Sequence, residues 1–229
     1  FAECFIGNTT GDKEHTGDPF WEKAERLLYV ALIGYLVYHC PEEDRSFSGL
    51  VTLLSLAKAK EGDEDYMSPL DLLFERVRTG RKYVRTGDAP ESYDYGGKGV
   101  YGGAQSGWSW VKVGEPVDVD KDFSLLHYKM FKDAAGKTLK SILISCNTRF
   151  EPAAIPQVRE ILSSDEMELD RMGDAGRRIA VFAIMSDARK TYSFLLAIMM
   201  WQTMNILCDK ALAEHGGSLP TPVTFLFDE

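Results

Sequence analysis

The chain has 229 residues, of which 45% are apolar, so it can bury the core of one large domain or of two small ones. Its net charge of −9 argues against indiscriminate binding of nucleic acid or anionic lipid by the whole surface, while local basic patches stay compatible with it. The four cysteines share no short spacing and therefore indicate neither a zinc knuckle nor a disulfide scaffold.

The sequence predicts no membrane span. Its longest apolar stretch, Leu27 to Tyr38, is too short to cross a bilayer. Phe1 to Cys4 shows no signal peptide and opens inside what looks like a helix, so we expect the chain to be a piece of a larger protein.

Helical periodicity and capping residues dominate the chain up to residue 162. The segment from Asp18 combines an N-cap acid with Pro19 at the first helical position, and its apolar residues from Leu27 to Tyr38 lie nearly all round the helix. Such a helix belongs at the centre of a bundle. The predicted helices cover residues 2–9, 18–39, 49–60, 68–79, 123–148 and 156–162.

Residues 80–122 interrupt this pattern with nine glycines and repeated Tyr and Trp, as a functional excursion, a small hairpin or a disordered loop would. Apolar and polar side chains alternate along residues 108–113 well enough to predict a short strand. Trp108 and Trp110 could stack bases of a single strand, although aromatic residues more often hold such a loop to the domain surface.

Five positive charges stand beside this segment in an otherwise acidic chain. Most clusters of this kind are only solvated, but the neighbouring aromatic residues make this one a candidate surface for a partner protein or single-stranded DNA. The cluster consists of Arg76, Arg78, Arg81, Lys82 and Arg85.

The last third of the chain predicts a strand, a long helix and a second strand. Residues 178–185 and 223–229 are short apolar runs, and the helix between them covers 191–214 and stops before Gly216. This βαβ order predicts parallel strands, with Asp228 and Glu229 at the carboxyl edge of the sheet. There they could hold Mg²⁺ and polarise water, or they could form an exposed acidic turn after a core strand.

Other motifs argue against a complete catalytic site in this chain. Gly136-Lys137-Thr138 resembles the end of a phosphate-binding loop, but that motif needs a glycine where Phe131 stands. We read Lys129, Lys132, Lys137 and Lys140 instead as the basic face of one helix. The histidines have no paired spacing, and no serine or cysteine lies on a nucleophile elbow.

Four motifs, taken in order, resemble the TraG/TraD-type coupling proteins of conjugation and type IV secretion. They are Asp18-Pro19-Phe20-Trp21, Asp65-Tyr66-Met67-Ser68-Pro69-Leu70, Ala134-Ala135-Gly136-Lys137-Thr138 with Ser141-Ile142-Leu143, and Phe225-Leu226-Phe227-Asp228-Glu229. The resemblance covers most of the chain except residues 80–122, which look like an insertion. In that family, a membrane-anchored hexameric ATPase carries an all-α domain between Walker A and Walker B.

The resemblance implies a mainly α protein with a small α/β part. Residues 1–162 would form a helical bundle, the all-α domain that recognises relaxase and transfer DNA on the cytoplasmic side of the bacterial membrane. Residues 177–229 would form a βαβ piece of the P-loop ATPase core. Asp228 would match the Walker B acid that holds the Mg²⁺ of ATP, and Glu229 the catalytic glutamate that activates water.

The sequence contains no Walker A, so we expect this chain alone neither to bind nor to hydrolyse ATP. A ring would be formed largely by ATPase surfaces that this sequence lacks, so we expect the chain alone to be a monomer or weak dimer. In the complete protein we expect a homohexamer that uses ATP and Mg²⁺ and contacts other type IV secretion components. The alternative is a non-catalytic helical protein-interaction module with an accessory βαβ unit.

Overall fold

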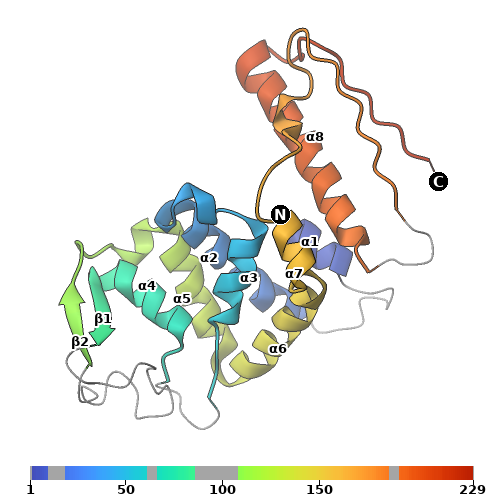
Figure 1. Cartoon of the computed structure of the whole chain (residues 1–229). Coiled ribbons are helices and arrows are strands. Elements are labelled where there is room, and N and C mark those ends of the chain that lie inside the picture. Colours follow the sequence, from blue (N-terminus) through green and yellow to red (C-terminus); the bar gives the residue numbers. More distant parts are fainter. Residues whose placement is uncertain (1, 10–18, 61–65, 86–107, 186–190, 229) are drawn as a thin grey trace. The chain divides into compact units, whose positions relative to one another are not determined.

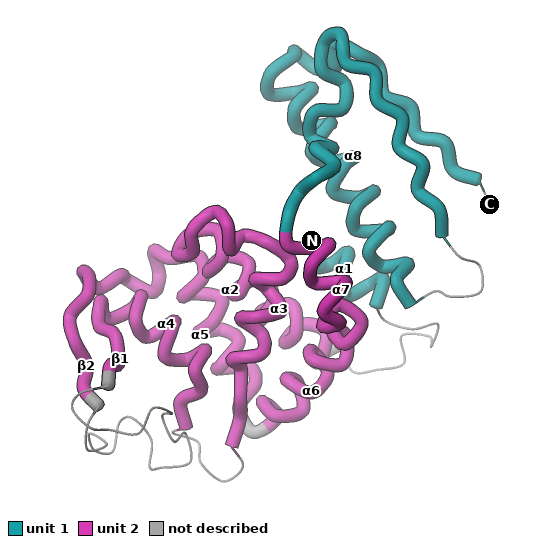
Figure 2. Tube along the Cα trace, in the orientation of Figure 1, with its two compact units in different colours: residues 1–14, 164–229 teal, residues 15–163 magenta. Residues whose placement is uncertain are grey.

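The computed structural model describes residues 2–9, 19–60, 66–85, 108–185 and 191–228 (Figure 1). The chain folds into two compact units, one of residues 15–163 and one of residues 1–14 with 164–229 (Figure 2). The described ranges contain eight α-helices and one two-stranded sheet. The predicted class, mainly α with a small α/β part, is confirmed.

Helix α2 (Pro19–His39) is central to the larger unit, as its apolar sequence predicts. The helices packed around it are α3 (Phe47–Ser55), α5 (Phe123–Ala135) and α6 (Leu139–Phe150). Leu28, Tyr29, Ala31 and Leu32 have no exposed surface. Burial at adjacent positions is what a helix surrounded on several sides requires.

A short 3-10 turn, η1 (Glu42–Asp44), connects α2 to α3. Ser46 caps α3 by accepting a hydrogen bond from the backbone N–H of Gly49. A Cβ at Gly49 would lie 2.1 Å from the carbonyl oxygen of Asp44. The close approach of these two backbones therefore requires glycine at this position.

Helix α4 (Pro69–Thr79) begins with a capping box between Ser68 and Asp71, as the sequence predicts. It ends at Gly80, whose φ of 65° is left-handed and whose added Cβ would lie 2.3 Å from the carbonyl oxygen of Gly114. Glycine at this turn lets the chain continue directly from the helix into a strand.

That strand, β1 (Arg81–Arg85), pairs antiparallel with β2 (Trp108–Lys112). The predicted strand at 108–113 is confirmed, and its partner comes from the start of the segment that we expected to be an insertion. The backbone N–H groups of Val113 and Gly114 both donate to the carbonyl of Gly80, so the end of β2 is tied to the end of α4.

Asp122 joins the N-terminus of α5 to the C-terminus of α2. It follows the 3-10 turn η2 (Val119–Lys121) and accepts hydrogen bonds from the backbone N–H of Leu125 and the hydroxyl of Ser124. Its other carboxylate oxygen lies 2.8 Å from His39 Nε2. Burial raises the pKa of Asp122, but these hydrogen bonds and His39 outweigh burial and leave the pKa below its ordinary value.

Replacing Asp122 by alanine is expected to lower the free energy of unfolding by about 1 to 2 kcal/mol at neutral pH, because α5 loses its cap. A carboxyl with a depressed folded pKa stabilises the protein above its unfolded pKa, and this contribution is lost as the pH falls through the folded value. Urea unfolding at about pH 7 and about pH 3 should therefore show a difference that shrinks in acid. The exposed neighbour Asp120, replaced by alanine, is the control, and an equal difference at both pH values would contradict this account.

The single helix predicted for residues 123–148 is wrong, because the structure divides it. Gly136 adopts φ 41° and ψ −128°, a conformation outside the helical region, and the 3-10 turn η3 (Gly136–Thr138) separates α5 from α6. Lys129 and Lys132 are therefore on α5 while Lys140 is on α6, and the predicted basic face of one helix does not form. The Lys137 side chain lies outside the described residues.

The end of the larger unit is held by polar contacts to α3. After the turn η4 (Glu151–Ala153) the chain forms α7 (Pro156–Ile161). The Arg159 guanidinium donates to the hydroxyls of Ser48 and Thr52 on α3. The two helices therefore stay together although neither is longer than three turns.

The smaller unit pairs the two ends of the described chain. Helix α1 (Ala2–Thr9) packs on α8 (Ser193–His215), with the rings of Phe5 and Phe194 edge to face at 5.7 Å. Residues 2–9 are predicted to belong to the helical domain, whereas these contacts place them in the smaller unit. Helix α8 ends at Gly216 in a left-handed conformation, as predicted.

Polar contacts hold the loops at one end of α8. The ammonium of Lys210 lies 2.5 Å from Asp174 Oδ1 and also donates to the carbonyl of Asp170, which lies in the turn η5 (Leu169–Arg171). Thr221 donates through its backbone N–H to the carbonyl of Gly173. These contacts hold the start of one extended segment, residues 177–185, beside the start of another, residues 222–228.

The strands predicted for residues 178–185 and 223–229 lie in two extended segments, 177–185 and 222–228, and the structure assigns no strand to either segment. They run in the same direction, opposite to α8, as a βαβ unit would (Figure 1). Phe182 and Leu226 are 87% and 91% exposed. Parallel strands are stable when both faces are covered, and an isolated pair is marginal, so the apolar pattern alone does not produce a sheet.

Within the described residues, no helix combines the length and apolar composition that crossing a bilayer requires.

Candidate functional site

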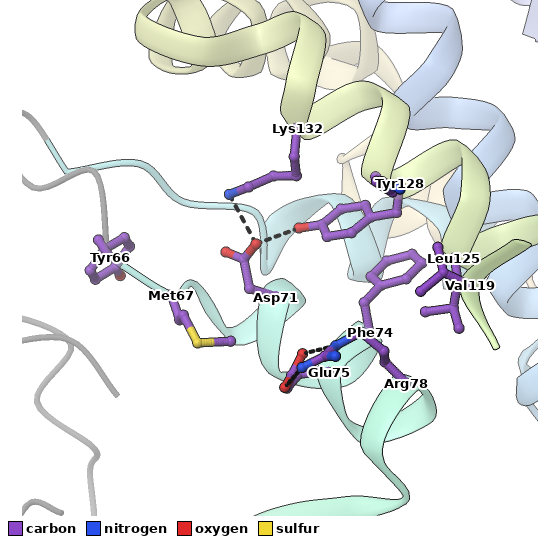
Figure 3. Close-up of a pocket in the computed structure, with 11 residues that line it drawn as sticks. Tyr66, Met67, Asp71, Phe74, Glu75, Arg78, Val119, Leu125, Tyr128 and Lys132 are labelled. Carbon is purple, nitrogen blue, oxygen red and sulfur yellow. Dashed lines mark hydrogen bonds and ion pairs between the residues drawn. The ribbon is translucent and has the colours of Figure 1, made fainter. Parts of the chain in front are cut away.

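A pocket of about 320 Å³ lies between α4 and α5 (Figure 3). Helix α4 contributes Asp71, Phe74, Glu75 and Arg78. Helix α5 contributes Leu125, Tyr128, Lys129 and Lys132. Both sets have the spacing i, i+3, i+4, i+7, which places each on a single helix face. Two helix faces therefore form most of the pocket, and Tyr66, Met67 and Val119 of the flanking segments complete its lining.

Asp71 connects the two helices. One of its carboxylate oxygens accepts from the Ser68 backbone N–H at 2.7 Å and from the Ser68 hydroxyl at 2.5 Å. The other accepts from the Tyr128 hydroxyl at 2.9 Å and lies 3.0 Å from the ammonium of Lys132. Both oxygens are occupied, so this buried carboxylate is a structural connection and not a free base.

The apolar wall of the pocket is a pair of stacked rings. Phe74 and Tyr128 lie 3.8 Å apart between ring centroids, with an angle of 2° between their planes. Burial, and after it the negative charge of Asp71, raises the pKa of Tyr128 well above its ordinary value. The phenol therefore stays protonated and keeps its hydrogen bond to Asp71.

Charged side chains make up part of the pocket lining. Arg78 forms a bidentate contact with Glu75, at 2.5 and 2.8 Å, and Lys132 is paired with Asp71. Lys129 is exposed and forms no ion pair with any part of the chain that the structure describes. Three cations against two carboxylates leave the pocket with one net positive charge.

The hairpin β1–β2 continues this surface from the C-terminal end of α4. Its register places Arg81 opposite Lys112 and Tyr83 opposite Trp110, and paired residues share a face. The Tyr83 and Trp110 rings are 5.0 Å apart. The arrangement therefore groups positive charge with aromatic rings, as a nucleic-acid or acidic-protein contact would require.

Most of the basic residues predicted from the sequence come together here. Arg76 and Arg78 are exposed on the last turns of α4, and Arg81 and Lys82 are exposed on β1. Arg78 is already engaged with Glu75, so Arg76, Arg81 and Lys82 are the stronger candidates. Arg85 pairs with Trp108 through the backbone, while both side chains lie outside the described residues.

The predicted Mg²⁺ and catalytic residues belong to the smaller unit. Asp228 is exposed at the end of an extended segment, and Glu229 lies outside the described residues. No group of three or more potential metal ligands occurs in the described ranges. A single exposed carboxylate nevertheless suits Mg²⁺, which proteins hold through one or two carboxylates together with phosphate oxygens.

Sequence reasoning missed the pocket and the position of Lys112. The shared helix-face spacing of Asp71 to Arg78 and of Leu125 to Lys132 is visible in the sequence, but nothing local shows that the two faces meet. Lys112 joins Arg81 only through strand pairing across a long intervening segment. Both arrangements arise from tertiary contacts.

A comparison with protein families supplies an independent finding. A family model described as type IV secretory system conjugative DNA transfer matches residues 5–229. No curated protein and no solved structure matches the chain.

Proposed function

The chain belongs to the type IV secretory system conjugative DNA transfer family, and from this membership we propose that it is part of a coupling-protein ATPase. Its larger unit would recognise relaxase or the relaxase-bound transfer DNA. Its smaller unit would contribute to the nucleotide site of a membrane-anchored homohexamer that exports the DNA through the other type IV secretion components.

The basic hairpin β1–β2 is the observation that supports recognition of relaxase or transfer DNA by the larger unit. In a chain of net charge −9, Arg81 and Lys112 lie on the same face of the hairpin as the Tyr83–Trp110 ring pair, and Lys82 is exposed on the other face. Positive charge attracts phosphate or acidic protein surfaces from a distance, and the half-buried rings add contact area at short range. We place the relaxase or single-stranded DNA contact on this hairpin.

The proposed contribution of the smaller unit to a nucleotide site depends on Asp228 and Glu229. When bound, ATP with Mg²⁺ would supply the phosphoryl group for hydrolysis, and Asp228 would hold the metal ion. Glu229 would orient the attacking water. The phosphate-cradling loop is not in this sequence, so in our proposal the two carboxylates act only together with other parts of the complete protein.

Reversing the charge of the hairpin tests the proposed recognition by the larger unit. Replacing Arg81 and Lys82 together by glutamate is expected to weaken binding of relaxase–DNA complex or of single-stranded oligonucleotide by about tenfold or more, because two attractive contacts become repulsive. For the oligonucleotide, the slope of log affinity against log salt should also fall by about 2. Fluorescence anisotropy at several salt concentrations measures both quantities.

The matched control reverses two exposed lysines elsewhere in the larger unit, Lys58 and Lys121, and changes the net charge by the same amount. It is expected to leave affinity within about twofold, because these residues are outside the hairpin. If both double variants weakened binding equally, net charge alone would explain the effect and the hairpin would have no specific role.

A further inference from the structure

We propose that the pocket between α4 and α5 binds an acidic peptide segment of the transported protein, taking up an apolar side chain while the adjacent Asp or Glu of the peptide contacts Lys129. This inference deepens the recognition role and rests on the proposed function. The hairpin is the proposed contact for relaxase or single-stranded DNA, and the pocket would add a separate site for a peptide segment.

The shape of the pocket favours a side chain as its occupant. Its volume of about 320 Å³ is at the lower end of ligand sites, which run from about 300 to 1,000 Å³. The inner wall is apolar, with Phe74, Leu125 and Tyr128 all at or below 8% exposure. A bulky apolar group that enters this space would be removed from water at little cost to the protein, since the wall is already formed.

The charges of the pocket favour a carboxylate beside that apolar group. Asp71 and Glu75 are satisfied by Lys132 and Arg78, so neither needs a ligand. Lys129 carries the remaining charge, and it is an exposed residue of the pocket lining (Figure 3 shows the neighbouring residues). One net positive charge complements one carboxylate of a partner.

The same features disfavour nucleic acid as the occupant. The rings of Phe74 and Tyr128 cover one another at 3.8 Å, so this pair leaves no gap between them into which a base could stack. The hairpin, which has no carboxylate in its strands, is the better place for DNA.

Peptide selection tests this inference with the whole chain immobilised. A random phage-displayed peptide library is selected for binding, with counter-selection against the variant Val119→Trp, whose larger side chain would fill the pocket from η2. The recovered peptides are expected to share a bulky apolar residue adjacent to Asp or Glu. Synthetic versions should lose about tenfold in affinity against Lys129→Glu.

The control variant Lys121→Glu makes the same charge change on η2, outside the pocket, and should alter the affinity of these peptides by less than about twofold. Thermal melts confirm that each variant is folded. The inference is overturned if no recovered peptide carries an acid, or if Lys129→Glu leaves peptide affinity unchanged. It is also overturned if Lys129→Glu weakens binding of an oligothymidine probe but not of the peptides.

Failure of this inference can be told apart from failure of the proposed function. If hairpin charge reversal weakens relaxase–DNA binding while no peptide depends on Lys129, the recognition role stands and the pocket is not its peptide site. If neither relaxase–DNA complex nor oligonucleotide binds the unmodified chain, the recognition role itself fails.

Discussion

Replacing Arg149 by leucine is expected to lower the free energy of unfolding by about 3 to 5 kcal/mol, because it leaves a buried carboxylate without its counter-charge. Glu25 on α2 is 1% exposed, and Arg149 Nε on α6 lies 2.7 Å from Glu25 Oε2. The other oxygen of Glu25 accepts a hydrogen bond from the Ser145 hydroxyl. These three groups connect the central helix to α6 through the interior.

The surroundings of Glu25 offer it little other compensation. Burial raises the pKa of the nearby Cys146 thiol to about 12, so that thiol stays neutral. Tyr29 is likewise buried and its pKa is raised, first by burial and then by Cys146 and Glu25. Neither group supplies positive charge. The guanidinium of Arg149 is therefore the group whose loss should matter most.

Urea unfolding of the single variant, followed by circular dichroism, measures this effect. A double variant with leucine at both 25 and 149 should be more stable than Arg149→Leu alone, since it removes the unpaired charge as well. Arg171→Leu is the control, because its pair with Glu168 is about half exposed, and it should destabilise the chain far less than Arg149→Leu does. A loss below about 1 kcal/mol for Arg149→Leu would show that water reaches Glu25.

Replacing Asp228 by asparagine in the complete protein is expected to reduce DNA transfer about a thousandfold or more. In the proposed function this carboxylate holds the Mg²⁺ that neutralises charge on the transferred phosphoryl group. Asparagine keeps the size of the side chain but removes the negative charge that binds the metal ion. Because Asp228 is exposed, the substitution should leave folding unchanged.

Conjugation frequency measures the effect, and the same substitution at Asp209, exposed on α8, is the control. Circular dichroism of both variant chains should match the unmodified chain. Transfer at the normal frequency with Asp228→Asn would contradict the nucleotide role of the smaller unit. It would favour the alternative, a non-catalytic helical protein-interaction module.

Much of the helical structure could be predicted because its determinants are local. The start of α4 depends on Ser68, Pro69 and Asp71, three neighbours that cap and begin a helix without help from elsewhere. The end of α8 depends on Gly216, which adopts the left-handed conformation at little cost. The central position of α2 follows from apolar residues all round it, since such a helix must be covered on several sides.

The errors came where local signals compete or depend on distant partners. Apolar residues continue on both sides of Gly136, but the backbone of this one residue leaves the helical conformation and so divides α5 from α6. The runs at 178–185 and 223–228 have a strand-like composition, yet Phe182 and Leu226 remain exposed and no strand forms. A parallel sheet needs neighbours on its edges and faces, and these are not determined by the run itself.

The sequence by itself determined the mainly α class, most helix boundaries, the concentration of positive charge from Arg76 to Arg85 and the resemblance to conjugative coupling proteins, which the family match supports. Only the tertiary structure decided that Arg81 stands opposite Lys112 and that Asp71 meets Tyr128 and Lys132. The physical reason is distance along the chain. Capping and periodicity act over a few residues, whereas a pocket between two helices requires chain segments more than fifty residues apart to pack together.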